Sequence, residues 1–364
     1  MIDFKNTVSL TALYRAWPAL ILVAGLVSSC LTPYQPDTQS IGRALVVEGM
    51  ITDQPGPYTV TLTQTADYSY AGLNLVVQGA TVTVSDNAGN QETLLEIRPG
   101  TYQTAASGLR GTPGRTYYIA IRTPDGKQYE SAPELLKPAP PIDRLTYQYH
   151  YDPFANTDDK RNTWEVYLDT KDPETTGDYY RWAWKNYEFI SACSVSDNAN
   201  SEGIFAGLPC CTSCWDINRC YSNCISISSD AAINGKAISG QYILSVPFTS
   251  RGIYYVEIEQ QSISLGAYRF FNSVRKLVNN TGGLFDAAPA TVGGNIRCTS
   301  HPDEAVFGYF GAAGTSVKAL KVDRSKDAVG VPVFKRIQTN PLAPCVACVE
   351  SAFRTANRPR WWDQ

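Results

Sequence analysis

The chain contains 364 residues, of which 43% are hydrophobic and 18% are charged. This balance is typical of globular proteins with buried cores, and it excludes a disordered chain. The formal net charge of −3 leaves no basic excess to neutralise phosphates, so we expect no nucleic-acid partner.

The amino-terminal segment has the features of an export signal. An apolar run at 16–27 follows Arg15, and it is too short for a membrane-spanning helix, which needs about 20 apolar residues. It matches the hydrophobic region of a secretory signal peptide. The tetrad VSSC at 27–30 resembles a bacterial lipobox, in which the cysteine becomes the lipidated amino terminus. We therefore predict a lipoprotein signal peptide over 1–29 and lipidation of Cys30; an ordinary signal peptide with a chance cysteine is the alternative.

Lipidation would also define the compartment of the mature chain. Acyl chains on Cys30 would hold the protein on a bilayer. Leu31 is not the aspartate that retains bacterial lipoproteins at the inner membrane. We therefore expect an outer-membrane lipoprotein, on either the cell surface or the periplasmic face. Residues 30–40 are polar and contain two prolines, which predicts a tether between the lipid and the folded part.

Residues 41–136 alternate short strand-like runs with turn signals. The run YTVTLTQ at 58–64 has period two, ATVTVSD at 80–86 leads into the turn NAGN, and RTYYIAIRT at 115–123 leads into PDG. Short strands spaced by about ten residues are typical of a sandwich. We predict an N-terminal Ig-like or transthyretin-like β-sandwich, followed at 137–143 by a Pro-rich linker.

Strand patterns resume after the linker, and we predict a second β domain over 144–340, also a sandwich. An aromatic strand there alternates rings with other residues, which puts Tyr180, Trp182 and Trp184 on one face. We interpret these rings as core residues, because sandwich cores use tryptophan in this way. A carbohydrate platform, joined by the paired tryptophans at 361–362, is the alternative.

Two segments interrupt the second sandwich. Residues 190–240 are rich in Ser, Asn, Gly and Cys, and they predict an insertion held by crosslinks because a plain loop of this length is uncommon. Residues 264–281 predict an amphipathic helix, with Ser264 as the N-cap and apolar residues three or four apart. The predicted fold class is thus mainly β, with two sandwiches, a Cys-rich insertion, one helix and a Cys-containing tail at 341–364.

Nine cysteines remain after Cys30, and an exported chain would use them for disulfides. The disulfide candidates are Cys193, Cys210, Cys211, Cys214, Cys220, Cys224, Cys298, Cys345 and Cys348. An odd number leaves at least one thiol without an intramolecular partner. Spacing does not decide the connectivity. A zinc site or a redox-active C-x-x-C pair is the alternative for the closely spaced cysteines, but we favour disulfides and predict no metal.

No catalytic motif is recognisable in the sequence. His150 and His301 are the only histidines, and neither lies in a metal or nucleophile motif. We interpret both as structural or surface residues. Carboxylates on expected strands, such as Glu257 and Glu259, fit solvent-facing positions better than a glycosidase pair. We therefore predict no enzymatic activity, no catalytic residue and no cofactor.

Five segments together resemble one family over nearly the whole mature chain. They are VVEGMITDQPGPYTVTLTQTADY, GATVTVSDNAGN, GTPGRTYYIAI, VEIEQQSISLGAYRFFNSVRKLVNNTGG and the closing CVAC…RPRWW. The family consists of uncharacterised Bacteroidota outer-membrane lipoproteins that carry a domain-of-unknown-function label. Its members are commonly encoded beside SusC-like TonB-dependent transporters, so the resemblance implies an accessory subunit of an uptake or export complex. No catalytic residues come with the family.

We therefore expect a non-enzymatic outer-membrane lipoprotein that acts as an accessory or binding subunit of a SusC-like TonB-dependent transporter. Loops and a disulfide-pinned insertion would do the binding, because a rigid loop loses less entropy when it binds. A free-standing surface adhesin or glycan-binding lipoprotein is the alternative. An envelope hydrolase is a third hypothesis, which a cleft with two carboxylates would favour.

Overall fold

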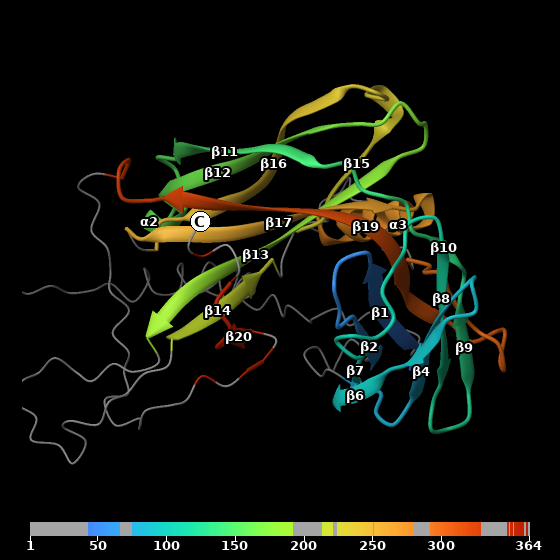
Figure 1. The fold of residues 1–364 in the computed structure, drawn as a ribbon. Helices are drawn as coiled ribbons and strands as arrows, with labels where there is room; N and C mark the ends of the chain where they lie inside the picture. The colour runs from blue at the N-terminus through green and yellow to red at the C-terminus, as the bar shows by residue number, and fades with distance from the viewer. Residues whose placement is uncertain are drawn as a thin grey trace, which may run out of the picture. The chain divides into compact units, whose positions relative to one another are not determined.

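The computed structural model describes residues 43–65, 75–191, 213–220, 224–249, 251–279, 292–328, 348, 350, 351, 353–359 and 362. The described residues belong to one compact unit, 43–364. The predicted signal peptide, Cys30 and the tether lie outside them. Strands dominate the unit, which confirms the prediction of a mainly β protein (Figure 1). Among the described residues, no helix is both long and apolar enough to cross a bilayer.

Eleven strands form the sheet with the most strands in the described structure. Along the chain they are β1 (Leu45–Thr52), β2 (Thr59–Gln64), β3 (Leu75–Val76), β6 (Leu95–Arg98), β7 (Thr101–Gln103), β13 (Tyr179–Ser191), β14 (Ser213–Arg219), β15 (Ser226–Ser229), β17 (Ile253–Ile263), β19 (Val306–Asp323) and β20 (Arg354–Thr355). Their spatial order is β20-β14-β13-β17-β19-β1-β2-β7-β6, with β15 on β13 and β3 on β2. This sheet supplies one layer to each of two sandwiches.

The first sandwich is closed by a second sheet. Its strands are β4 (Thr81–Asp86), β5 (Gln91–Thr93), β8 (Thr116–Arg122), β9 (Gln128–Ser131), β10 (Glu134–Leu135) and β18 (Ile296–Cys298), in the order β18-β9-β8-β4-β5 with β10 on β8. Period-two alternation buries Val82 and Val84 of β4 and turns Thr81 and Thr83 to the opposite face. One apolar cluster joins this sheet to β1, β2 and β7. The predicted N-terminal β-sandwich is confirmed.

The second sandwich is covered by three antiparallel strands. They are β11 (Ile142–Tyr151), β12 (Asn162–Lys171) and β16 (Ala237–Pro247), in that order. A four-residue helix, α2 (Asp158–Arg161), links β11 to β12, and a 3₁₀ turn, η2 (Asp230–Ala232), precedes β16. Tyr180 and Trp182 are buried in the core of this sandwich, and Trp184 packs half-buried against it. The interpretation as core residues is confirmed for Tyr180 and Trp182, whereas Trp184 lies at the margin of the core.

Strand β19 belongs to both sandwiches. Its first half pairs in parallel with β1, from Leu45–Val306 to Thr52–Ala313, and its second half pairs antiparallel with β17. Figure 1 shows β19 in orange, running alongside β17 and continuing to the strands around β1. The first core also takes residues from β18 and β19, so the range 144–340 contributes to both sandwiches.

A glycine allows β1 and β19 to pair in parallel. Gly308 has φ of +90°, and a Cβ added there would lie 1.9 Å from the carbonyl oxygen of Val47. Residues with a side chain rarely adopt this conformation. The close approach of the two backbones therefore depends on glycine at this position.

The predicted amphipathic helix is confirmed as α3 (Leu265–Val278). Ser264 caps it: its side-chain oxygen accepts a hydrogen bond of 3.0 Å from the backbone N–H of Ala267. Arg275 and Lys276 lie in the last turn, where positive charge interacts favourably with the negative end of the helix dipole. Only Ala267 is fully buried, so most of the apolar stripe of the helix is half-exposed.

The Cys-rich insertion contains regular structure that the sequence analysis did not expect. β14 pairs with β13 and with β20 of the tail, because the run SCWDINR can extend the sheet at its edge. Disulfides join Cys214 to Cys348 and Cys220 to Cys224. The other candidates at 193, 210, 211 and 345 lie outside the described residues.

Cys298 is a disulfide candidate that forms no disulfide, which agrees with the odd number of cysteines after Cys30. Its thiol is free, and the side chain is buried. It ends the short strand β18, which pairs with β9, and it packs in the core of the first sandwich.

Candidate functional site

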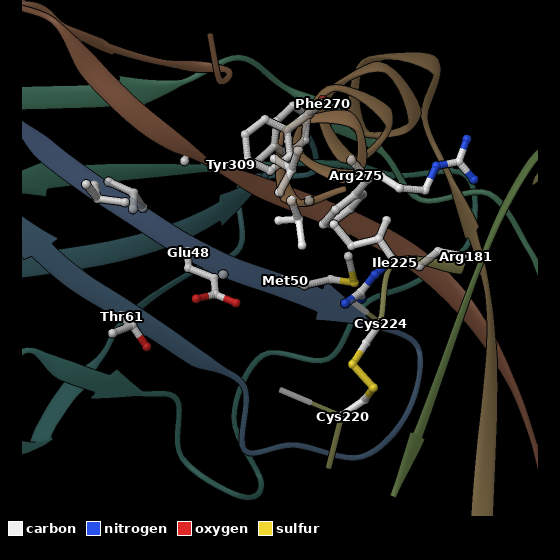
Figure 2. Close-up of a pocket in the computed structure, with 18 of the residues that line it drawn as sticks. Glu48, Met50, Thr61, Arg181, Cys220, Cys224, Ile225, Phe270, Arg275 and Tyr309 are labelled. Atoms are coloured by element: carbon white, nitrogen blue, oxygen red, sulfur yellow. A yellow bond between two sulfur atoms is a disulfide. The ribbon is translucent and has the colours of Figure 1, made fainter. Parts of the chain in front are cut away.

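A hollow in the described structure lies beside α3. It is open to solvent, has a volume of about 850 Å³, and is lined by residues of β1, β2, β13, β14, β19 and α3. This volume lies within the range of small-molecule and cofactor sites. Figure 2 shows Glu48 and Thr61 on one side and Arg181, Arg275 and the Cys220–Cys224 disulfide on the other.

The apolar wall of the hollow comes from the exposed stripe of α3. Phe270, Phe271 and Val274 line it, and each is half-buried. Phe270 packs on Tyr309 of β19, with ring centroids 5.2 Å apart. Spacing of three to four residues puts these side chains on one face of the helix. The stripe that identifies the helix in the sequence is therefore also the wall of a candidate binding site.

Arg181 supplies a fixed cation at this site. It alternates with Tyr180 and Trp182 along β13, so its side chain lies on the face opposite the core. Its guanidinium lies 4.6 Å from the ring centroid of Phe271, and its Nη1 donates to Gln261 Oε1 at 2.9 Å. Burial lowers the pKa of Arg181, but an arginine stays protonated in proteins.

The rim adds further charges of both signs. Arg219, which directly precedes Cys220, and Arg275 line the hollow, and Glu48 projects from β1 (Figure 2). An apolar wall beside several guanidinium groups fits a ligand with apolar groups and a carboxylate. The arrangement suits the binding of such a ligand.

The histidines lie away from this hollow. His150 is exposed on β11, and His301 is exposed in the loop after β18. Both are surface residues, as the sequence analysis proposed. Neither belongs to the residues that line the hollow.

The expected solvent-facing carboxylates of β17 are instead partly buried. Glu257 and Glu259 have side chains 12% and 19% exposed, and both form ion pairs with Lys185 of β13. The prediction was wrong for these two residues, because the antiparallel pairing of β13 with β17 brings a lysine between them. They form a structural ion-pair cluster.

The aromatic tail does not present a free sugar platform at Trp362. Its ring stacks on Tyr255, with centroids 3.7 Å apart, and lies 5.7 Å from the ring of Trp215. Stacking between side chains uses the faces that a sugar would need. Trp361 lies outside the described residues.

Comparison with known families adds one finding. Residues 31–319, well over half of the chain, match the family described as Domain of unknown function (DUF4249). The chain belongs to the DUF4249 family. No curated protein matches it. The match confirms the domain-of-unknown-function part of the resemblance. It covers the first sandwich, most of the second, α3 and the residues that line the hollow of this DUF4249 member.

A buried glutamate lies behind the hollow. Glu134 Oε1 accepts hydrogen bonds from Tyr309 Oη at 2.5 Å and from Asn295 Nδ2 at 3.4 Å. Its Oε2 is buried and has no hydrogen-bond partner among the described residues. Burial raises the pKa of Glu134, because desolvation penalises the charged form.

This raised pKa predicts a pH-dependent stability. The protonated Glu134 carboxyl contributes to the free energy of unfolding. This contribution is fully present below the unfolded-state pKa near 4.5, and it is lost as the pH rises through the folded-state pKa. We expect Glu134→Gln to remove this loss, which amounts to about 1.4 kcal/mol for each unit by which the folded pKa exceeds the unfolded one. Urea unfolding at pH 5 and pH 8 measures it. Glu174→Gln, at an exposed position, is the control that should keep the wild-type pH dependence. Equal pH dependence in wild type and Glu134→Gln would contradict the prediction.

Proposed function

We propose that this DUF4249 member is a non-enzymatic outer-membrane lipoprotein that serves as an accessory binding subunit of a SusC-like TonB-dependent transporter. The hollow beside α3 is the observation that carries the proposal. Its walls belong to regular strands and a capped helix, and a disulfide closes one edge. Such a preformed surface loses little conformational entropy when a partner binds.

The chemistry of the hollow indicates what the partner offers. Phe271 and Val274 provide apolar surface, while Arg181 and Arg275 provide positive charge. A peptide segment of the transporter with apolar and acidic side chains fits this combination. We propose that such a segment binds here.

Membrane attachment in this proposal rests on the lipobox. The tetrad VSSC at 27–30 supports lipidation of Cys30 and removal of 1–29. We expect Cys30→Ser to deplete the protein from the outer-membrane fraction, because the acyl chains are its anchor there. Fractionation of the native host into inner-membrane, outer-membrane and soluble parts, with immunoblotting, measures this. Mutant protein that stays in the outer-membrane fraction at the wild-type level would contradict the lipid anchor.

Partner binding has a separate test. The tagged full-length protein is purified from detergent-solubilised outer membranes, and a SusC-like transporter is expected in a stoichiometric amount. Val274→Glu puts a negative charge inside the hollow and should reduce the transporter at least tenfold. Ser273→Glu adds the same charge on an exposed neighbouring position of α3 and should not. Recovery without a transporter, or equal recovery with both variants, would contradict the proposal.

A further inference from the structure

Three metal-ligating side chains of different chemistry converge at the end of the first sandwich. They are Cys298, His301 and Glu304, and their ligand atoms all lie within 4.8 Å of one another. The residues follow one another in the pattern C-x-x-H-x-x-E, in the loop between β18 and β19. The site is distinct from the hollow beside α3, whose lining includes none of the three.

We propose that Cys298, His301 and Glu304 bind a divalent transition-metal ion of the zinc type, with one coordination position left open. A thiolate, an imidazole and a carboxylate are the three ligand types that Zn²⁺ uses in proteins. One thiolate and one carboxylate balance the two positive charges of the ion. Three protein ligands with a fourth position for water resemble exchangeable sites more than closed structural ones.

The backbone already holds the loop in the required arrangement. The N–H of Thr299 donates to Gln128 O at 2.8 Å, which fixes the loop to β9 beyond the end of β18. The N–H of Glu304 donates to His301 O at 3.0 Å and closes the turn. Ligands bound at about 2.0–2.3 Å in a tetrahedral site lie roughly 3.5 Å apart. The three ligand atoms, which lie within 4.8 Å of one another, therefore approach by up to about 1.3 Å when an ion binds, and the exposed position of His301 gives its side chain room to move.

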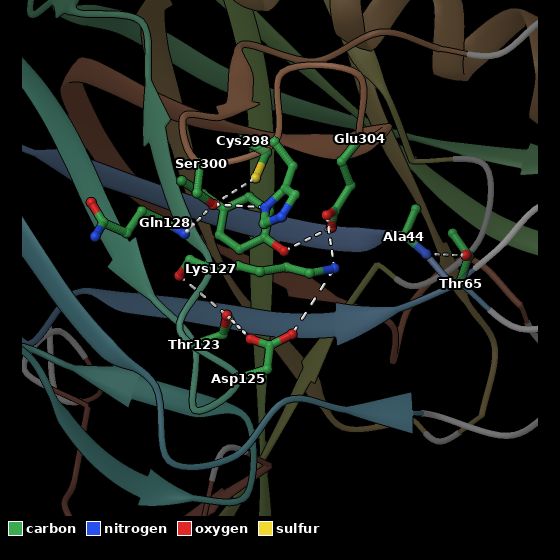
Figure 3. Close-up of polar contacts among 11 residues, drawn as sticks. Ala44, Thr65, Thr123, Asp125, Lys127, Gln128, Cys298, Ser300 and Glu304 are labelled. Atoms are coloured by element: carbon green, nitrogen blue, oxygen red, sulfur yellow. Dashed lines mark hydrogen bonds and ion pairs between the residues drawn. The ribbon is translucent and has the colours of Figure 1, made fainter.

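Ser300 is placed to orient two of the ligands. Its Oγ lies 3.1 Å from His301 Nδ1 and 3.4 Å from Cys298 Sγ, and it accepts a hydrogen bond of 3.1 Å from the N–H of Gln128. When Nδ1 donates to Ser300 Oγ, the Nε2 lone pair is directed to the ion. Metal-binding histidines commonly have such a partner on the second ring nitrogen. Figure 3 shows Ser300 between Gln128 and Cys298.

The third ligand is also held by neighbours. Glu304 Oε1 accepts from Tyr129 Oη at 2.8 Å, and Oε2 pairs with Lys127 Nζ at 2.8 Å. Asp125 lies on the other side of Lys127, 4.0 Å from its Nζ (Figure 3). Without a metal, Lys127 supplies the positive charge next to the thiol and the carboxylate. A bound ion competes with Lys127 for Glu304, and Asp125 remains as a partner for the lysine.

Metal titration of the full-length protein in detergent tests the proposal. Zn²⁺ binding is measured by calorimetry, and Co²⁺ is used as a spectroscopic probe because a thiolate–Co²⁺ bond absorbs in the near ultraviolet. We expect Cys298→Ser to abolish this absorption and His301→Ala to weaken Zn²⁺ binding at least tenfold. His301 is exposed, so its removal should leave the fold intact, which circular dichroism checks.

His150→Ala is the matched control, since His150 is the other histidine and is also exposed. It should bind both ions like the wild type. Lys127→Met removes the competing cation and should tighten Zn²⁺ binding severalfold. Three outcomes would overturn the proposal: no Zn²⁺ binding by the wild type, equal affinity of wild type and His301→Ala, or weaker binding by Lys127→Met.

Discussion

Replacing Cys214 and Cys348 together with alanine is expected to lower the free energy of unfolding by about 5 kcal/mol. The disulfide joins residues separated by 134 positions. In the chain-entropy model, a crosslink stabilises by restricting the unfolded chain, and the effect grows with the logarithm of the loop length. The bridge also ties the tail strand β20 to β14 at the edge of the eleven-stranded sheet.

The short disulfide provides the control for this prediction. Cys220 and Cys224 are separated by only 4 positions, so their double alanine variant should lose about 2 kcal/mol. The expected difference between the two double variants is about 3 kcal/mol, measured by guanidinium unfolding under non-reducing conditions. If both variants lose the same stability, the long bridge does not act through chain entropy.

Replacing Trp182 with alanine should also cost about 5 kcal/mol, by a different mechanism. The indole is 1% exposed in the core of the second sandwich. Its removal leaves a cavity, which typically costs about 3–5 kcal/mol for a large aromatic residue. Its Nε1 also donates to Gln260 Oε1 at 2.9 Å, so the buried amide oxygen loses its partner.

Two further variants separate the contributions at Trp182. Trp182→Phe keeps most of the side-chain volume and removes the hydrogen bond to Gln260, so its loss of stability should be clearly smaller than that of Trp182→Ala. Phe154→Ala removes a ring that is 93% exposed and should change stability by less than about 0.5 kcal/mol. Equal losses for Trp182→Ala and Phe154→Ala, from urea midpoints, would exclude a core role for Trp182.

Local patterns predicted the elements of this fold well. Ser264 and the apolar spacing after it predicted α3, which the structure confirms. The alternation of aromatic residues predicted that Tyr180 and Trp182 are core residues, and both are buried. These predictions depend on residues that are close in the sequence. Over such short distances, the period of 3.6 in a helix or 2.0 in a strand decides which side chains share a face.

Long-range pairing could not be predicted in the same way. Nothing local in β19 indicates that its first half pairs with β1, because both strands are apolar and many partners satisfy such a pattern. The boundary expected after Leu136 therefore did not reveal that β18 and β19 complete the first sandwich.

The candidate sites show the same division. The sequence revealed the stripe of α3 but not that Arg181 would stand above Phe271, since β13 and α3 meet only in the fold. Cys298 and His301 are three positions apart, yet we interpreted them separately, because one looked like a disulfide former and the other like a surface residue. Their convergence with Glu304 depends on the turn that the backbone makes after β18.

The pairing of β1 with β19 has a consequence for how the protein is made. Leu45 lies opposite Val306, so β1 has left the ribosome more than 200 residues before its neighbour is synthesised. During that interval one edge of β1 has no strand to bind, and such an edge can recruit other chains. The first sandwich can therefore be completed only after the last quarter of the chain has been synthesised. We expect folding to be late and slow for this reason, and to depend on protection from aggregation.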